Sequence, residues 1–152
     1  MAGKAIYIDT SALLKRYVLE PHTAEVNAFV DRHAPLGISR LSMLEARCAL
    51  ARRCRAGQIT ELLETQVLQA IRLDIQDGTL ELSQVADTQI SRAFDLLEQL
   101  RATVSLRSLD AIHLAIALER KTPGFVTADK NQAEAARQLG FTVYSFIAEN
   151  TP

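Results

Sequence analysis

Short apolar runs and longer segments of helical periodicity alternate along the chain, and few architectures accommodate that alternation. The apolar runs predict strands at residues 5–8, 36–39, 80–85, 125–127 and 142–146. The periodic segments predict helices at residues 9–19, 22–33, 42–56, 60–77, 109–120 and 131–139, with a further helix that begins at Asp87. Strands that alternate with helices form βαβ units. We therefore expect an α/β fold with a central, mainly parallel sheet and helices on both sides.

The length and composition predict one domain with a real core. We expect a single domain over residues 1–152, with residues 149–152 as a loose tail. Apolar residues make up 48% of the chain and charged residues 23%, which argues against a disordered, collagen-like or disulfide-stapled chain. The formal net charge of -1 argues against a basic coat for nucleic acid. Any contact with RNA or DNA must therefore come from a local patch.

The cysteines and the hydropathy pattern indicate a cytoplasmic protein. Cys48 and Cys54 lie six residues apart in one helical segment, which places them on different faces, so we expect reduced thiols. The N-terminal segment contains no long apolar stretch of the kind that directs export. The longest apolar run, residues 111–118, is too short to span a bilayer. We expect a soluble chain with no membrane contact.

Four acidic residues occupy positions that a parallel sheet brings to one edge. Asp9 directly follows the first predicted strand, and Asp129 follows the strand at residues 125–127. Glu45 and Asp110 lie in the first turns of predicted helices. In an open parallel sheet, ligands bind at the carboxyl ends of the strands, and the helix N-termini open onto the same rim. We therefore expect the four carboxylates to converge in one cleft.

Converging carboxylates indicate a bound cation. They repel one another, and in a site without a Lys or Arg partner a bound cation offsets that repulsion. Oxygen ligands suit hard ions, so we expect Mg²⁺ or Mn²⁺. Such an ion can activate a water and stabilise the charge of an in-line displacement at phosphorus. The hydroxyls of Thr10, Ser11 and Thr127 flank the acids and are expected to orient water or a carboxylate.

Each acid also has a purely structural interpretation. Asp9 can cap the helix that follows it, and Asp129 can be a turn residue. Glu45 is three residues after Ser42, which is the spacing of a capping box, and Asp110 can offset a helix dipole. Separate caps give no reason for four acids at one rim, so both interpretations stay open at this point.

Four segments of the sequence form an ordered set. Residues 8–14 read IDTSALL, residues 41–46 LSMLEA, residues 106–115 LRSLDAIHLA, and residues 125–130 FVTADK. In this order they resemble the four acidic motifs of PIN domains, and the third and fourth look very like those of VapC-type toxins. The resemblance extends from Tyr7 to Phe146.

The resemblance carries implications for fold and function. It implies a single PIN-like domain with a sheet of four or five strands, and a Mg²⁺- or Mn²⁺-dependent endoribonuclease. It also implies the toxin of a type II toxin–antitoxin pair, a homodimer that cleaves RNA and is silenced by a small cognate antitoxin. It assigns a supporting hydroxyl to Thr127. It assigns the catalytic, metal-binding role to Asp9, Glu45, Asp110 and Asp129.

Basic residues near the acids are candidate contacts for RNA phosphates. Residues 40–55 carry five arginines against one acid, a net charge of +4. We take Lys15, Arg40 and Arg47 as candidate contacts, with a solvated surface as the alternative for each. His113 lies three residues after Asp110 on the same helix face. Its apolar neighbours favour a hydrogen-bonded core histidine, so it stays outside the predicted site.

Other functions fit the sequence less well. A phosphatase with a nucleophilic aspartate needs Asp-x-Asp at the first strand end, where this chain has Ser11 at the third position. A receiver domain needs a phosphoacceptor aspartate at the end of a mid-chain strand, and the strand at residues 80–85 is followed by the helix-capping Asp87. The remaining alternative is a catalytically inactive PIN module that only binds nucleic acid or protein. The presence of all four acids argues against it.

Overall fold

The computed structural model describes residues 4–149, and the predicted tail residues 150–152 lie outside this part. The strands are β1 (Ile6–Ile8), β2 (Leu36–Ser39), β3 (Leu80–Ser83), β4 (Gly124–Thr127) and β5 (Thr142–Ser145). The helices are α1 (Thr10–Leu13), the 3₁₀ helix η1 (Leu14–Arg16), α2 (Thr23–His33), α3 (Arg40–Arg55), α4 (Glu61–Gln76), α5 (Asp87–Leu100), α6 (Ser108–Arg120) and α7 (Lys130–Gln138).

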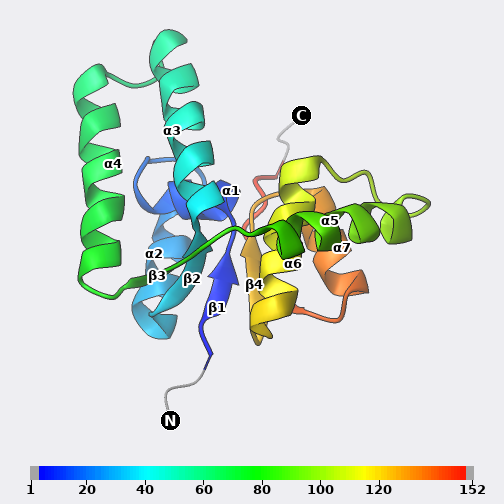
Figure 1. Cartoon of the computed structure of the whole chain (residues 1–152). Helices are drawn as coiled ribbons and strands as arrows, with labels where there is room; N and C mark the ends of the chain where they lie inside the picture. The colour runs from blue at the N-terminus through cyan, green and yellow to red at the C-terminus, as the bar shows by residue number, and fades with distance from the viewer. Residues whose placement is uncertain (1–3, 150–152) are drawn as a thin grey trace.

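All five strands are parallel and form one sheet in the order β3-β2-β1-β4-β5, with β1 in the middle (Figure 1). The predicted α/β class and the parallel sheet are confirmed. Because the strands run in the same direction, every loop that follows the carboxyl end of a strand lies on the same rim of the sheet. The central position of β1 places the start of α1 at the middle of that rim.

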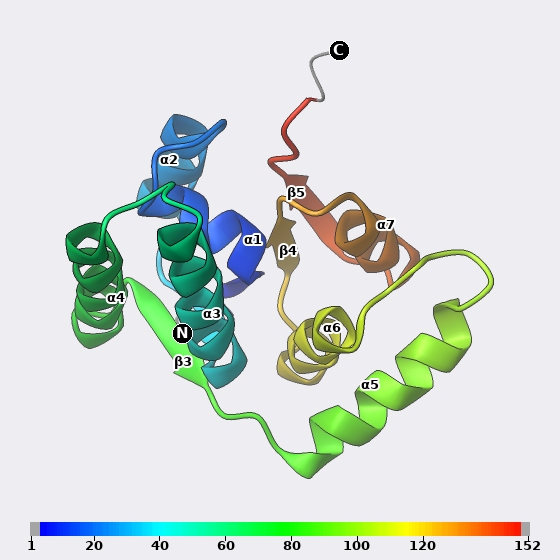
Figure 2. The same ribbon diagram turned by 90° about the horizontal axis from the view of Figure 1, so that it is seen from above.

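Two apolar layers cover the sheet, one on each face. Ile8 of β1 is paired in register with Val126 of β4, and both belong to the layer that packs against α1–α4. Tyr7 and Phe125 form the neighbouring register pair and belong to the layer beneath α5–α7. This alternation is the two-residue period of a strand with both faces buried. Figure 2 shows α3 and α4 on one side and α5 outside α6 on the other.

Two predicted helices differ from the structure by more than one residue at an end. The predicted helix at residues 9–19 has only four α-helical residues, and it tightens into η1, where the backbone N–H of Tyr17 donates to the Leu14 carbonyl at 3.1 Å. Helix α3 begins at Arg40 instead of residue 42. Its N-cap is Ser39, whose backbone N–H donates to the Ser42 hydroxyl at 3.1 Å. The hydroxyl of Ser42 therefore closes the helix start from inside its first turn.

Two further sequence features bear on the setting of the chain. Cys48 and Cys54 both carry free thiols, in keeping with the reduced state expected from their spacing. Among residues 4–149, no helix combines the length and the apolar character needed to cross a membrane.

Candidate active site

The structure brings the four predicted acids to the rim at the carboxyl ends of the strands. Asp9 lies between β1 and α1, and Asp129 lies between β4 and α7. Glu45 and Asp110 belong to α3 and α6. Within residues 4–149, however, no group of three or more His, Cys, Asp or Glu side chains is arranged closely enough to hold a metal ion. The acids therefore share a rim without forming one close cluster: Asp9 and Glu45 have separate partners, and Asp110 and Asp129 share a third.

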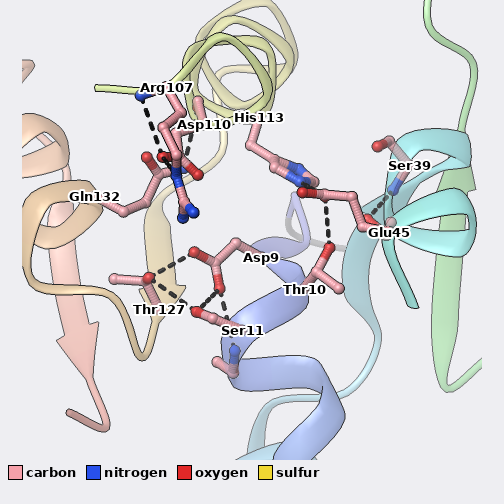
Figure 3. A network of polar contacts seen from close by, with 12 residues as sticks. Asp9, Thr10, Ser11, Ser39, Glu45, Arg107, Asp110, His113, Thr127 and Gln132 are labelled. Carbon is pink, nitrogen blue, oxygen red and sulfur yellow. Dashed lines mark hydrogen bonds and ion pairs between the residues drawn. The ribbon is translucent and has the colours of Figure 1, made fainter. Parts of the chain in front are cut away.

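Asp9 is buried among hydroxyl groups, with an exposed fraction of only 4%. Ser11 Oγ donates to its Oδ1 at 2.6 Å, and the backbone N–H of Ala12 donates to the same oxygen at 3.1 Å. Thr127 Oγ1 donates to Oδ2 across the gap between α1 and β4 (Figure 3). Burial raises the pKa of Asp9 to about 6, although these hydrogen bonds and the charge of His113 act in the opposite direction.

Glu45 is held on one of its two carboxylate oxygens. Thr10 Oγ1 donates to Oε1 at 2.8 Å, and Nε2 of His113 contacts the same oxygen (Figure 3). Burial raises the pKa of Glu45, but the hydrogen bond and charge of His113, with smaller effects of Thr10 and Arg107, outweigh it, and the net pKa is lowered. The capping-box interpretation of Glu45 is wrong, because Ser42 closes the box with Ser39 instead.

Asp110 and Asp129 share a basic partner that the sequence analysis did not assign. Nε of Arg107 donates to Asp110 Oδ2 at 3.2 Å, and Nη2 of Arg107 lies 3.7 Å from Asp129 Oδ2. Figure 3 shows the guanidinium directed into the space between Asp110 and Asp9. Two of the acids therefore have an Arg partner, because Arg107 precedes Asp110 by about one helical turn and its guanidinium extends toward Asp110. That three-residue spacing is the signal in the sequence that identifies it.

Three of the acids have a structural role at a helix start, and for Asp129 this role is that of a helix cap instead of the predicted turn residue. Asp9 and Asp129 cap α1 and α7, because the third backbone N–H beyond each of them donates to its Oδ1 at 3.1 and 2.8 Å. The backbone N–H of Arg107 approaches Asp110 Oδ2 at 3.4 Å. For Asp9 and Asp129 the cap uses one carboxylate oxygen, so the second oxygen is available for contacts across the rim.

A polar side chain behind these acids was also missed by the sequence analysis. Gln132 of α7 is fully buried, and its Nε2 donates to the backbone carbonyl of Asp110 at 3.1 Å. Within the described part of the chain its Oε1 has no hydrogen-bond partner. A buried amide oxygen without a partner is costly, and so the site offers a further oxygen to a polar or cationic guest.

A cleft of about 810 Å³ opens beside the acids, with Glu45 and Asp110 in its wall. Of the predicted phosphate contacts only Lys15 lines it, and Lys15 Nζ is bound to Glu20 Oε1 at 3.3 Å and to the Pro21 carbonyl at 3.0 Å. Three further arginines line this cleft: Arg52, Arg53 and Arg107.

The other two predicted contacts lie away from this cleft. Arg40 lines a smaller hollow beside β3, and Arg47 lines one between α3 and α4, where it pairs with Glu64. The basic face of α3 is therefore divided among three hollows.

Comparisons with known proteins give a consistent result. Residues 6–138 match the family model of the PIN domain. Ribonuclease VapC47 of Mycobacterium tuberculosis (strain CDC 1551 / Oshkosh) is 32% identical over 146 residues, which cover 92% of this chain and 96% of that protein.

Solved structures share the fold at lower sequence identity. The crystal structure of Mycobacterium tuberculosis VapC20, described as a toxin that cleaves the sarcin-ricin loop, superposes with a TM-score of 0.71 at 17% identity. The match covers 91% of this chain and 97% of that one. The DNA-bound VapBC structure from Salmonella typhimurium gives a TM-score of 0.61 at 16% identity, with 93% and 98% of the two chains covered.

Proposed function

We propose, from the premise that this chain belongs to the PIN domain family, that it is a metal-dependent endoribonuclease and the toxin of a type II toxin–antitoxin pair. The observation that supports this most directly is the set of four acids at one rim, supplied by four separate elements: Asp9, Glu45, Asp110 and Asp129. The ribonuclease name of a relative that is 32% identical over nearly the whole chain supports the choice of RNA as substrate. We further propose that residues 1–152 form one PIN-like domain.

The residues of the rim supply the type of ligand that a divalent cation prefers, although within residues 4–149 no three acidic, His or Cys side chains lie close enough to hold one as they stand. The guanidinium of Arg107 already lies among the acids, so their carboxylates face a space in which positive charge is stabilised. The unpartnered Oε1 of Gln132 adds a neutral oxygen to this donor set. Carboxylate and amide oxygens suit Mg²⁺ or Mn²⁺. We propose that the ion is held by the four acids of the rim.

In the proposed mechanism, some residues orient the carboxylates of the rim and others bind the RNA backbone. An ion held by the four acids would activate a water and would stabilise the charge that develops on the phosphate. Ser11 and Thr127 hold the Asp9 carboxylate from both sides, and Thr10 holds Glu45. Arg52 and Arg53 line the cleft and are suited to bind the RNA backbone. In this proposal Lys15 orders the wall of the cleft through Glu20, and Arg40 and Arg47 extend the basic surface along α3.

Cleavage of RNA by the purified chain tests this function. We expect an end-labelled RNA to be cut with Mg²⁺ or Mn²⁺ and to remain intact with a chelator, because the four acids alone bring no positive charge to the phosphate. Restored cutting after Mn²⁺ is added back to the chelated sample would tie the activity to the ion. RNA that is bound but stays intact with either ion would support the catalytically inactive PIN module instead.

We propose that the chain forms a homodimer and binds a cognate antitoxin in the cytoplasm. Solved neighbours include a toxin–antitoxin complex from Klebsiella pneumoniae and the VapBC structure from Salmonella typhimurium. Phe94 and Ile90 of α5 are 73% and 49% exposed, so apolar surface extends beyond the core. Light scattering at micromolar concentration should give twice the 16.8 kDa mass of one chain. A mass of one chain without a partner would contradict the homodimer.

A further inference from the structure

We propose that His113 is the positioning residue of this site: it holds Glu45 Oε1 so that the other carboxylate oxygen is presented to the cleft. The inference rests on the proposed function, because it describes how one of the proposed metal ligands is oriented. His113 is 1% exposed, so it does not reach substrate and acts through Glu45.

The contacts of Glu45 determine which oxygen is free. The two side-chain donors, Thr10 Oγ1 and His113 Nε2, both meet Oε1. Among residues 4–149 no hydrogen bond to Oε2 is found, and Glu45 lines the cleft beside Asp110. An ionised carboxylate only accepts hydrogen bonds, so Nε2 of His113 carries a proton and donates it toward Oε1.

The ring of His113 is itself fixed from the opposite side. The hydroxyl of Tyr7 lies 2.6 Å from Nδ1, and the same hydroxyl lies 3.1 Å from Ser39 Oγ. Tyr7, Ser39 and His113 are all buried, at 0%, 0% and 1% exposed. A series of hydrogen bonds therefore runs from Ser39 through Tyr7 and His113 to Glu45, and Figure 3 shows its last contact, between His113 and Glu45.

This series of hydrogen bonds links the position of Glu45 to the centre of the sheet. Tyr7 belongs to β1, two residues before Asp9, and Ser39 is the N-cap of the helix that carries Glu45. A glutamate on a helix has three rotatable side-chain bonds, and fixing them in advance lowers the entropic cost of binding an ion. Partners that orient metal ligands typically change metal affinity or activity by about 10- to 100-fold when they are lost.

The experiment compares two substitutions of His113 in the full chain. His113→Leu removes the donor and keeps an apolar side chain in the core. His113→Gln keeps an N–H group near the position of Nε2. We expect His113→Leu to weaken Mn²⁺ binding, measured by titration calorimetry, by about 10- to 100-fold, and His113→Gln to recover most of that loss. The rate of RNA cleavage at subsaturating Mn²⁺ should follow the same order.

A matched core variant separates positioning from general destabilisation. Ile116→Ala removes a fully buried side chain of the same helix and should lower the melting temperature without changing the Mn²⁺ affinity. If His113→Leu fails to fold, Tyr7→Phe tests the same chain of hydrogen bonds, because it removes only the hydroxyl, and Mn²⁺ binding should again weaken.

Each outcome distinguishes this inference from the function on which it rests. A folded His113→Leu or Tyr7→Phe variant with the Mn²⁺ affinity of the wild type would overturn the role of His113. Equal losses in the Leu and Gln variants would also overturn it, since the retained N–H group would then have no effect. A wild-type chain that neither binds Mn²⁺ nor cleaves RNA would overturn the proposed function itself.

Discussion

Asp9→Asn is expected to lower the rate of metal-dependent RNA cleavage by more than about 100-fold, beyond the usual effect of losing a partner of a metal ligand. The substitution removes one negative charge and nearly keeps the shape of the side chain. Asp9 lies at the middle of the rim, where its Oδ2 meets Thr127 and its Oδ1 caps α1. An asparagine oxygen still accepts the cap hydrogen bond, so the fold is retained while the anionic ligand is lost.

The measurement is single-turnover cleavage of a labelled RNA at saturating Mn²⁺. Asp95→Asn is the matched control, because Asp95 is an exposed acid of α5, outside the residues that line the cleft. It should cleave at the wild-type rate. Wild-type cleavage by Asp9→Asn, in preparations free of contaminating ribonuclease, would show that Asp9 is not a catalytic residue.

In the absence of metal, the same substitution is expected to stabilise the protein at neutral pH. Burial raises the pKa of Asp9 from 3.8 to about 6, so the folded state holds a proton that the unfolded chain releases. The stability that this protonation contributes is fully present below pH 3.8 and is lost as the pH rises through about 6. This loss in the free energy of unfolding corresponds to about 3 kcal/mol. Asparagine at this position does not ionise, so the Asp9→Asn variant does not undergo the loss.

Urea unfolding with a chelator at pH 4, 5, 6 and 8 tests this prediction. The free energy of unfolding of the wild type should fall relative to that of Asp9→Asn between pH 4 and pH 6, and the difference should level off above pH 6. Asp95→Asn should follow the wild type across the series. Parallel profiles for wild type and Asp9→Asn, or a less stable Asp9→Asn at pH 8, would contradict the raised pKa.

Much of the fold follows from local patterns in the sequence. The apolar runs at residues 36–39 and 142–146 predict β2 and β5 to within one residue, because short runs of apolar and β-branched side chains favour strands. The helical period likewise predicts α4 and α6 closely. The alternation of these elements leads to a parallel sheet, and a parallel sheet has one rim for ligands. The positions of Asp9, Glu45, Asp110 and Asp129 at that rim follow from the same reasoning.

What lies between those acids was decided by the tertiary structure. Glu45 meets His113 across 68 positions of the chain, and Asp9 meets Thr127 across 118. Arg107 reaches both Asp110 and Asp129 only because α6 and α7 start at neighbouring places on the rim. A local pattern reports the period, caps and turns of its own segment. The order of the strands and the packing of the helices determine which distant side chains share a hydrogen bond, and the burial that results from this packing raises the pKa of Asp9.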